Sequence, residues 1–398
     1  MQLRNLIRRL QGFSEILKLD PVLAMKELAR RLIGLNYQHK GFKVTDEQSY
    51  IPLKRLIRHA CIEPTESEIT LKIRSRESYL RVPRPYMSQR LPSICSMLEA
   101  LEELSELGIT IVMKDRNVQL RYPDGSTLTL DILKDHPELA VLAHMLHIYG
   151  YALVDHDYCD ECLETLGVER CACIQSLGDK RVLLLPNNVR LLTHTIGCAV
   201  CIFETFFHRI HDVPGLRGAT VIDVGAWVGD SALRFASLGA SKVFAVEPDP
   251  VNFQGLIENI ELNDQFKNRI KVLNMALGSG KILRFRRDYA YSGNPSAYIL
   301  SSGEVFEVKS AILEELLDIL GLEDVDYLKV DCKGCEHEMF KDPGVLRRFS
   351  TIKIEYTYNP TRLASIIREQ GFKVKIMRHE PFYKESTLSH GTIVASRQ

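Results

Sequence analysis

Hydrophobic and polar positions alternate regularly in the second half of the chain. From Thr220 onward, short β-branched runs alternate with stretches whose apolar positions recur every three or four residues. This alternation predicts an α/β domain with a mainly parallel sheet and helices on both faces. We expect strands at 220–224, 242–246, 270–274, 327–331, 351–356, 372–377 and 392–395, helices at 230–238, 250–263, 311–320 and 360–370, and a hairpin at 283–287 with 305–308.

The first part of the chain has a different pattern. Apolar residues at helical spacing over 3–17, 21–35 and 91–107 predict a mainly helical region, which the proline-rich segment 81–86 interrupts. Two alternating runs within 109–130 predict a β-hairpin or a three-stranded meander.

The length of the chain predicts more than one domain. At 398 residues it exceeds the roughly 250 to 300 residues at which a single core stops growing. We expect a mainly helical α+β domain over residues 1–150, a cysteine-rich connector over 151–182 and the α/β domain over 183–398.

Composition adds little to this picture. The hydrophobic content of 45%, charged content of 26% and net charge of +0 are those of a soluble globular protein without a general attraction to nucleic acid or membrane. From Met1 to Arg90, however, basic residues outnumber acidic ones about two to one. This excess fits either a solvated helical face or a basic docking surface for an anionic partner.

Targeting signals are not expected. The start MQLRNLIRRLQGF has no continuous apolar core and no small-residue cleavage site. The longest apolar stretch, 191–207, carries His194 and Glu204 and is too short for a membrane span. We therefore expect a cytoplasmic protein without a transmembrane segment.

A glycine-containing turn follows the first strand of the α/β domain. In VIDVGAWVGD, Gly225 permits a sharp turn and Gly229 permits close approach at the start of the next helix. In open α/β sheets this is where ligands bind. The G-x-x-x-G spacing lacks the third glycine of the dinucleotide fingerprint, so a structural turn without a cofactor is the alternative.

Acidic residues indicate which ligand would fit the turn. Glu247 ends the next strand 22 positions after Gly225, close to the roughly 20 expected of a carboxylate that binds a ribose diol. Asp223 and Asp230 bracket the turn, which suits a cationic ligand better than a pyrophosphate. S-adenosylmethionine has a ribose, an ammonium and a sulfonium, and is therefore the expected ligand.

Four segments in order make this interpretation specific. They are VIDVGAWVGDSALRFASLGASKVFAVEPDP at 221–250, NMALGSG at 274–280, DYLKVDCKGCEHEMF at 326–340 and IKIEYTY at 352–358. Together they resemble the FkbM family of S-adenosylmethionine-dependent methyltransferases. The resemblance implies a class I methyltransferase (Rossmann-like) fold, with a seven-stranded sheet whose last strand is antiparallel.

The resemblance also implies roles for individual residues. Asp223, Gly225 and Gly229 would cradle the methionine part of the cofactor, and Glu247 would bind the ribose. Asn274 to Ala276 would border the adenine, and Asp331 would lie by the sulfonium and the acceptor. The expected cofactor residues are Asp223, Gly225, Trp227, Gly229, Asp230, Glu247, Pro248, Asn274, Ala276 and Asp331.

The chain departs from the family at two positions. Trp227, the only tryptophan, stands where the family commonly has asparagine, so the indole either packs over the cofactor or fills the sheet edge. Lys333 stands where the family pattern usually has an acid, whereas Glu336 is retained.

Methyl transfer to a hydroxyl needs a positioned base beyond the strand ends. The candidates are Asp331, Glu336, His337 and Glu355, with Lys333 as a partner for one of the acids or for an anionic acceptor. Burial among apolar and aromatic residues would make Glu355 a usable base, and a purely structural carboxylate is the alternative.

The cysteines suggest a metal site. Cys159, Cys162, Cys171 and Cys173 follow the spacing C-x-x-C, eight residues, C-x-C, which can close a tetrahedral zinc site. Reduced free thiols and disulfides are the alternatives. Cys198 with Cys201 and Cys332 with Cys335 form further pairs, and the second pair could make a redox-sensitive disulfide.

Three functions follow from these features. The leading one is O-methylation of a hydroxyl on a glycan, lipid or small metabolite, with S-adenosylmethionine as donor. The second is RNA (tRNA) methylation, in which the basic N-terminal region and a zinc knuckle would dock the nucleic acid. The third is a non-catalytic protein that binds the cofactor or a nucleic acid.

Overall fold

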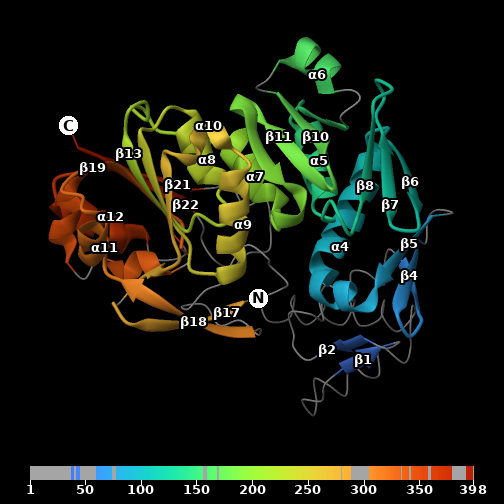
Figure 1. Ribbon diagram of the computed structural model, residues 1–398, viewed down its shortest axis with the longest axis horizontal. Coiled ribbons are helices and arrows are strands. Elements are labelled where there is room, and N and C mark those ends of the chain that lie inside the picture. The colour runs from blue at the N-terminus through green and yellow to red at the C-terminus, as the bar shows by residue number, and fades with distance from the viewer. Residues whose placement is uncertain are drawn as a thin grey trace, which may run out of the picture. The chain divides into compact units, whose positions relative to one another are not determined.

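The structure is a computed structural model, shown in Figure 1. The chain divides into two compact units, Met1–His144 and Met145–Gln398. The segment expected as a separate connector, residues 151–182, lies in the second unit. The structure describes residues 37–39, 42–44, 60–73, 78–155, 159–167, 170–278, 280–287, 304–332, 334–339, 342–356, 360–378 and 391–397.

The first unit contains more sheet than the sequence predicted. The segment 60–83 was expected to be part of a mainly helical region, but it forms an antiparallel sheet of three strands, β3, β4 and β5. Every second residue of β4 is buried, as in a strand with one face on the core. Within the described residues of this unit, the bounds are β1 (Tyr37–His39), β2 (Phe42–Val44), β3 (Ala60–Pro64), β4 (Glu68–Ile73), β5 (Tyr79–Pro83) and α4 (Arg84–Glu106).

The proline-rich segment has a different role from the one expected. Pro83 ends β5 and Pro85 lies in the first turn of α4, where a missing backbone N–H costs no helical hydrogen bond. The prolines therefore mark the passage from strand to helix. The helices expected at 3–17 and 21–35 lie outside the described residues.

The meander predicted at 109–130 is confirmed. Strands β6 (Thr110–Lys114), β7 (Asn117–Arg121) and β8 (Thr127–Asp131) form an antiparallel sheet, and helix α5 (Leu139–Ile148) follows. The buried residues alternate in each strand, so one face of this sheet packs on the core.

The second unit opens with a four-stranded sheet of order β12-β11-β10-β9. Helix α6 (Cys159–Leu166) connects the parallel strands β9 and β10, as a crossover connection must. The cysteine-rich segment is therefore part of a sheet with its own helix. The strands are β9 (Ala152–Asp155), β10 (Cys171–Leu177), β11 (Lys180–Leu185) and β12 (Val189–Leu192).

The expected seven-stranded sheet is present, with the order β15-β14-β13-β19-β20-β22-β21. All neighbours pair in parallel except β22, which is antiparallel to both β20 and β21. This is the strand order of a class I methyltransferase sheet, so the predicted fold of this domain is confirmed. The strands are β13 (Thr220–Val224), β14 (Lys242–Val246), β15 (Ile270–Leu273), β19 (Val325–Val330), β20 (Phe349–Tyr356), β21 (Lys373–Arg378) and β22 (Gly391–Ser396).

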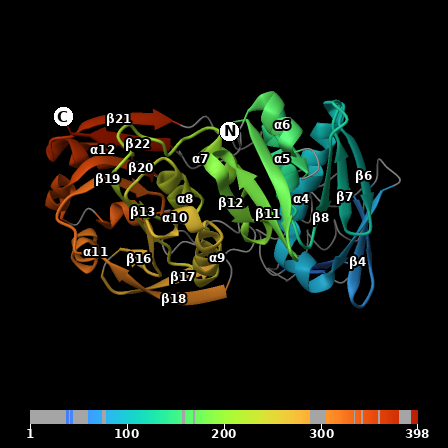
Figure 2. The same ribbon diagram turned by 45° about the horizontal axis from the view of Figure 1, so that its top comes forward.

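Helices cover both faces of this sheet, as Figures 1 and 2 show. Helices α8 and α9 lie on one face, and α11 and α12 lie on the other. Nearly all of α8 is buried, which explains its run of small and apolar residues. The helices are α7 (Ala199–Phe206), α8 (Asp230–Ser237), α9 (Pro250–Glu261), α10 (Asp264–Lys267), α11 (Leu313–Leu320) and α12 (Pro360–Glu369).

A small sheet of order β16-β18-β17 completes the second unit. The antiparallel pair β17 (Ile282–Arg287) and β18 (Glu304–Ala311) confirms the predicted hairpin, and β16 (Ala276–Leu277) adds a parallel edge. No helix in the described part of the chain is long and apolar enough to cross a lipid bilayer.

Candidate functional site

The glycine turn after β13 is packed against two neighbouring strands. Gly225 has φ +74°, and a Cβ atom there would lie 1.9 Å from the carbonyl oxygen of Asp331. The Gly225 N–H donates to the carbonyl of Val246 at 2.9 Å. Gly229 has φ +89°, and its Cβ would lie 2.6 Å from Leu256 Cδ1. Only glycine therefore permits the turn to approach β19 and α9 this closely.

Trp227 occupies a left-handed backbone conformation in the middle of this turn. Its φ is +47°, which is a rare value for a bulky side chain and costs about 1 to 3 kcal/mol. Asparagine tolerates this region far better, which gives a physical reason for the asparagine common in the family. The indole is 7% exposed, so it packs inside the protein in this structure.

Glu247 meets the turn, as the sequence predicted. The Trp227 N–H donates to Glu247 Oε2 at 2.9 Å, and the Asp249 N–H donates to Oε1 at 3.0 Å. Burial raises the pKa of Glu247 to about 8, although these hydrogen bonds oppose the shift. The strand end of β14 thus presents a buried carboxylate to the turn after β13.

Residues after β15 lie at the same edge of the sheet. The side-chain amide of Asn274 donates to the carbonyls of Glu247, at 2.9 Å, and Pro248, at 3.2 Å. Ala276 is buried at the start of the small sheet. The predicted ribose and adenine residues are therefore brought together, because β14 and β15 end side by side.

Asp223 is engaged by a residue that the sequence did not single out. Lys329 Nζ lies 2.9 Å from Asp223 Oδ1 and donates to the Gly225 carbonyl at 2.8 Å. Ser231 donates to the other carboxylate oxygen at 2.6 Å. Burial alone would lower the pKa of Lys329, but Asp223 and the neighbouring carboxylates raise it above its usual value.

The ion pair lies inside the domain and is nearly free of solvent. Asp223 is 0% and Lys329 is 3% exposed, and the two residues face each other across β13 and β19. A cofactor ammonium would have to compete with Lys329 for this carboxylate. In the structure, the Asp223 carboxylate is bound by Lys329 and Ser231 and does not face a ligand.

Asp230 is also engaged. It opens α8, and Thr205 of α7 donates to its carboxylate at 2.6 Å. Burial raises the pKa of Asp230 to about 6. The side chain fastens α7 to the turn, a role that the sequence did not reveal because Thr205 lies 25 residues away.

The candidate bases differ in their surroundings. Asp331 and Glu355 directly follow the paired residues Val330 and Ile354, so they occupy neighbouring positions on adjacent strands. Both are half-buried. Glu355 is thus less buried than its apolar and aromatic neighbours in the sequence indicated.

Glu336 and Lys333 complete the predicted set. Glu336 is fully buried, and its Oε2 accepts a hydrogen bond from the Gly334 N–H at 2.7 Å. It therefore caps its own loop. Lys333 lies outside the described residues.

The four clustered cysteines do not form the predicted zinc site in this structure. Disulfide bonds join Cys159 to Cys173 and Cys162 to Cys171, and a disulfide sulfur has no thiolate to offer a metal. Cys159 and Cys162 of α6 lie next to Cys171 and Cys173 of β10. This arrangement is compatible with two disulfides as well as with a tetrahedral zinc site. Within the described ranges, no cluster of three or more metal-ligating side chains is found.

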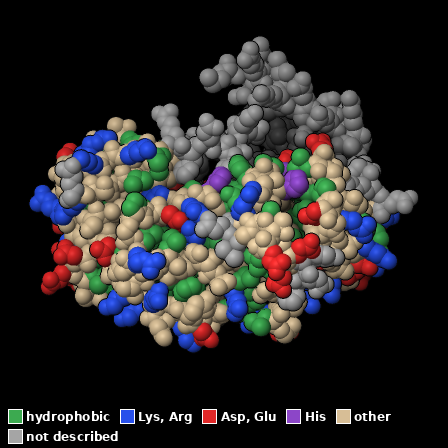
Figure 3. All heavy atoms as spheres, turned by 90° about the horizontal axis from the view of Figure 1, so that it is seen from above, with side chains coloured by type: hydrophobic (Ala, Val, Ile, Leu, Met, Phe, Trp, Pro, Cys, Tyr) green, Lys and Arg blue, Asp and Glu red, His purple; other side chains and the backbone are tan. Residues whose placement is uncertain are grey.

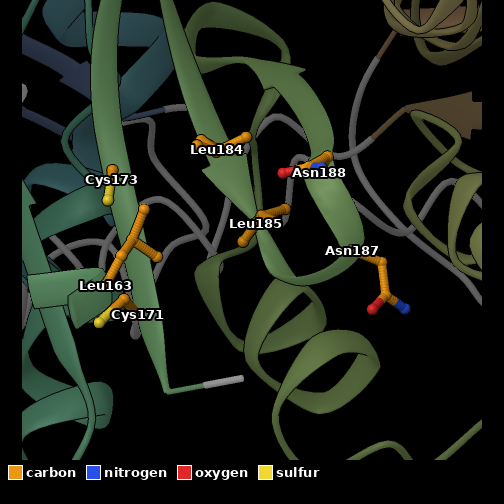
Figure 4. Close-up of a pocket in the computed structure, with 7 residues that line it drawn as sticks. All are labelled: Leu163, Cys171, Cys173, Leu184, Leu185, Asn187 and Asn188. Carbon is orange, nitrogen blue, oxygen red and sulfur yellow. The ribbon is translucent and has the colours of Figure 1, made fainter. Parts of the chain in front are cut away.

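A small cavity of about 30 Å³ adjoins these bridges. Figure 4 shows Leu163, Cys171 and Cys173 at one end of it and Asn187 at the other. It is too small for an organic cofactor and belongs to the packing between β10 and the turn after β11.

Lys329 and Asn259 contact the glycine turn, although no motif in the sequence indicated them. Asn259 of α9 is fully buried and donates to the carbonyl of Val228, in the glycine turn, at 2.9 Å. It also accepts from the Leu192 N–H at 2.8 Å, so it ties the turn to β12. A lysine inside an apolar strand, two residues before Asp331, was the available signal for a buried ion pair.

Comparison with protein families identifies the domain that carries this site. The model of the methyltransferase FkbM domain matches residues 223–374. The matched range begins at Asp223 and includes the glycine turn, Glu247 and Asp331.

Individual relatives are more distant. A segment of 55 residues is 42% identical to a tRNA(Phe) (4-demethylwyosine(37)-C(7)) aminocarboxypropyltransferase of Pyrococcus horikoshii, covering 14% of this chain and 19% of that protein. An FkbM methyltransferase structure from Methylobacillus flagellatus has 16% identity and a TM-score of 0.32, covering 44% of this chain and 43% of its own. Magnesium protoporphyrin IX methyltransferase from Synechocystis has 13% identity and a TM-score of 0.32, covering 52% and 83%.

Proposed function

We propose that this chain, whose residues 223–374 match the methyltransferase FkbM domain, transfers a methyl group from S-adenosylmethionine to a hydroxyl of a glycan, a lipid or another small metabolite. The observation that carries the proposal is the meeting of Glu247 with the glycine turn, where its carboxylate accepts from the Trp227 N–H at 2.9 Å.

The residues present fit the cofactor. Gly225 and Gly229 let the turn pack directly against the Asp331 carbonyl and Leu256, and so fix the backbone that would face the methionine part of the cofactor. A carboxylate has about four acceptor sites, so Glu247 can accept from the ribose in addition to its two backbone donors and the Asn252 amide. When bound, the cofactor supplies an electrophilic methyl group on a sulfonium.

The protein would act mainly by positioning. Methyl transfer is an in-line displacement, so the alignment of acceptor and methyl group provides most of the acceleration. Lys329 and Asn259 hold the carbonyls of Gly225 and Val228, which fixes the turn. Asp331 and Glu355, at neighbouring strand ends, are the proposed pair from which one carboxylate removes the proton of the acceptor.

The test is a calorimetric titration of the full chain with S-adenosylhomocysteine, followed in parallel by the fluorescence of Trp227. We expect saturable binding, and Glu247→Ala should weaken it by about 1 to 3 kcal/mol through the unpaired ribose hydroxyls. Gly225→Ala should abolish it because of the contact with Asp331.

Gly218 offers a matched control for the glycine substitution. It has φ +80° but no atom within 4 Å of an added Cβ, so Gly218→Ala adds backbone strain without the clash. This variant should bind the cofactor like the wild type. Absence of binding to the wild-type chain would refute the proposed function.

The acceptor class needs a separate experiment. Incubation with methyl-labelled S-adenosylmethionine and a cell extract, followed by fractionation, should place the label in glycan, lipid or small metabolites. Label in RNA would instead favour the second candidate below, and no label in any fraction would favour a non-catalytic cofactor-binding protein.

RNA methylation is the second candidate, and the match to a tRNA-modifying enzyme favours it. A segment that binds RNA should lose affinity steeply as salt rises, because phosphate contacts release counterions. Figure 3 gives this candidate no added support, since basic and acidic side chains of the described residues are interspersed on the face in view.

The cytoplasmic location stays a prediction.

A further inference from the structure

A disulfide lies directly beside the candidate catalytic strand end. Cys332 and Cys335 are bonded, and they flank the loop between Asp331 and Glu336. Cys335 is 2% exposed and belongs to the core of the domain, whereas Cys332 is half-buried. Both residues therefore pack on the core, and Cys332 is the one that is partly exposed.

The loop is packed onto the glycine turn. The Asp331 N–H donates to the Val224 carbonyl at 3.0 Å, and the Asp331 carbonyl occupies the space that a Gly225 side chain would need. The Cys332 nitrogen lies 3.6 Å from the same ideal Cβ position. A displacement of Cys332 would therefore act on the turn through its neighbour Asp331.

The carboxylate of Glu336 contacts the loop that contains Cys332 and Cys335. It accepts from the Gly334 N–H at 2.7 Å, and its Oε2 lies 3.6 Å from Cys332 Sγ. If the disulfide opens, two thiols cannot stay at bonded distance. Because Cys335 is 2% exposed and Cys332 is partly exposed, we expect Cys332 to move further.

The other disulfides do not combine a partly exposed cysteine with a position next to the glycine turn. All four sulfurs of the bridges between α6 and β10 belong to buried residues, which restricts attack by a thiolate. Cys198 and Cys201 are half-buried like Cys332, but they lie at the start of α7, where Cys198 is the N-cap.

We propose that the Cys332–Cys335 disulfide is a redox-modification site that controls cofactor binding, and that a small or protein dithiol is its reductant. The inference rests on the proposed function, since the controlled event is binding of S-adenosylmethionine. The disulfide form holds the turn in its binding geometry, and the dithiol form releases it.

The exchange is balanced in atoms and electrons. A thiolate of the reductant attacks Cys332 Sγ, the Cys332–Cys335 bond breaks, and Cys335 leaves as a thiolate. The second thiol of the reductant then attacks the mixed disulfide, releases Cys332 and forms an intramolecular disulfide. The protein gains two electrons and two protons, which the dithiol loses.

The test compares affinities for S-adenosylhomocysteine before and after treatment of the full chain with dithiothreitol. Reduction should weaken binding about tenfold, the effect of returning conformational freedom to roughly one backbone residue. The double variant Cys332→Ser with Cys335→Ser should bind like reduced wild type in both conditions.

Cys198→Ser with Cys201→Ser is the matched control. It removes a bridge of the same spacing, and serine retains the N-cap acceptor of α7. We expect it to bind and respond to reduction as the wild type does. Wild-type affinity that does not change on reduction would overturn the inference, as would tight binding by the Cys332 and Cys335 variant.

A measurement on the wild type alone keeps the inference testable if the variant does not fold. Stepwise reduction with alkylation and mass spectrometry should label Cys332 and Cys335 before Cys159, Cys162, Cys171 and Cys173, and affinity should fall in the same step. A fall that accompanies only the later cysteines would contradict the inference. Absence of binding in every redox state would instead refute the proposed function.

Discussion

The cofactor edge of the seven-stranded sheet and the cysteine-rich part of the four-stranded sheet bury reactive groups in different ways. The cofactor edge encloses Glu247 and the pair Asp223 and Lys329, which stay ionisable. The cysteine-rich part encloses four sulfurs that are covalently joined. Ionisable groups in a protein interior cost stability unless they are paired, whereas a disulfide stabilises the fold.

Under the proposed function, this difference distinguishes a region that binds the cofactor from one that stabilises the fold. The cofactor edge also carries a tryptophan at φ +47°, and backbone strain of this kind clusters at functional sites.

Lys329→Met should produce the largest loss of stability. It leaves the fully buried Asp223 carboxylate without its cation, which costs about 3 to 5 kcal/mol. Denaturant unfolding measured by circular dichroism checks this value. Adding Asp223→Asn to Lys329→Met should recover part of the loss, and a double variant no more stable than the single one would show that the pair is not coupled.

Stability should fall as pH rises because of Glu247. Its pKa is about 8 in the fold against 4.5 for an ordinary glutamate, so the folded state holds a proton that the unfolded chain has released. Below about pH 4.5 both states are protonated, and above about pH 8 both are ionised. The stabilisation is therefore lost across this window, by about 2 kcal/mol between about pH 6 and pH 8.

Glu247→Gln isolates this contribution, because the amide does not titrate. The difference in unfolding free energy between wild type and variant should change across the window in the stated direction. If the difference in unfolding free energy does not change with pH, the Glu247 carboxylate is more solvated than the structure indicates. Cofactor affinity should rise toward about pH 8, since the ionised carboxylate accepts both ribose hydroxyls.

The sequence predicted the cofactor edge better than any other region. Strand β13 and strand β14 have the expected bounds, and Glu247 meets the turn as its spacing from Gly225 indicated. Short apolar runs and glycines are local signals, so they can be read without the fold. Lys329 was missed because its partner Asp223 comes from a strand 106 residues earlier, and only the parallel register joins them.

In the cysteine-rich region, by contrast, the sequence did not decide between the possible structures. Its spacing was compatible with zinc, free thiols or disulfides, and only the pairing of α6 with β10 selects among them. The strands β3, β4 and β5 were missed for a related reason. Their alternation is short, and the surrounding sequence favoured helices.

Removing the Cys159–Cys173 disulfide should lower the free energy of unfolding less than either change at the cofactor edge. Cys159→Ala with Cys173→Ala opens a loop with a sequence separation of 14 residues, and the inner Cys162–Cys171 bridge keeps part of it closed. We expect a loss of about 1 to 2 kcal/mol, with unchanged affinity for S-adenosylhomocysteine. Weakened cofactor binding in this variant would break the proposed division of roles.

Asn274→Ala should cause the smallest change in stability but should act on binding. The exposed amide donates to the carbonyls of Glu247 and Pro248, and their loss costs about 1 kcal/mol or less. Because these carbonyls border the proposed ribose site, affinity should fall severalfold. Gln265→Ala is the matched control, since it removes one exposed amide bond to the Asn188 carbonyl, next to the cysteine-rich region. Equal loss of affinity in both variants would mean that Asn274 acts only through general stability.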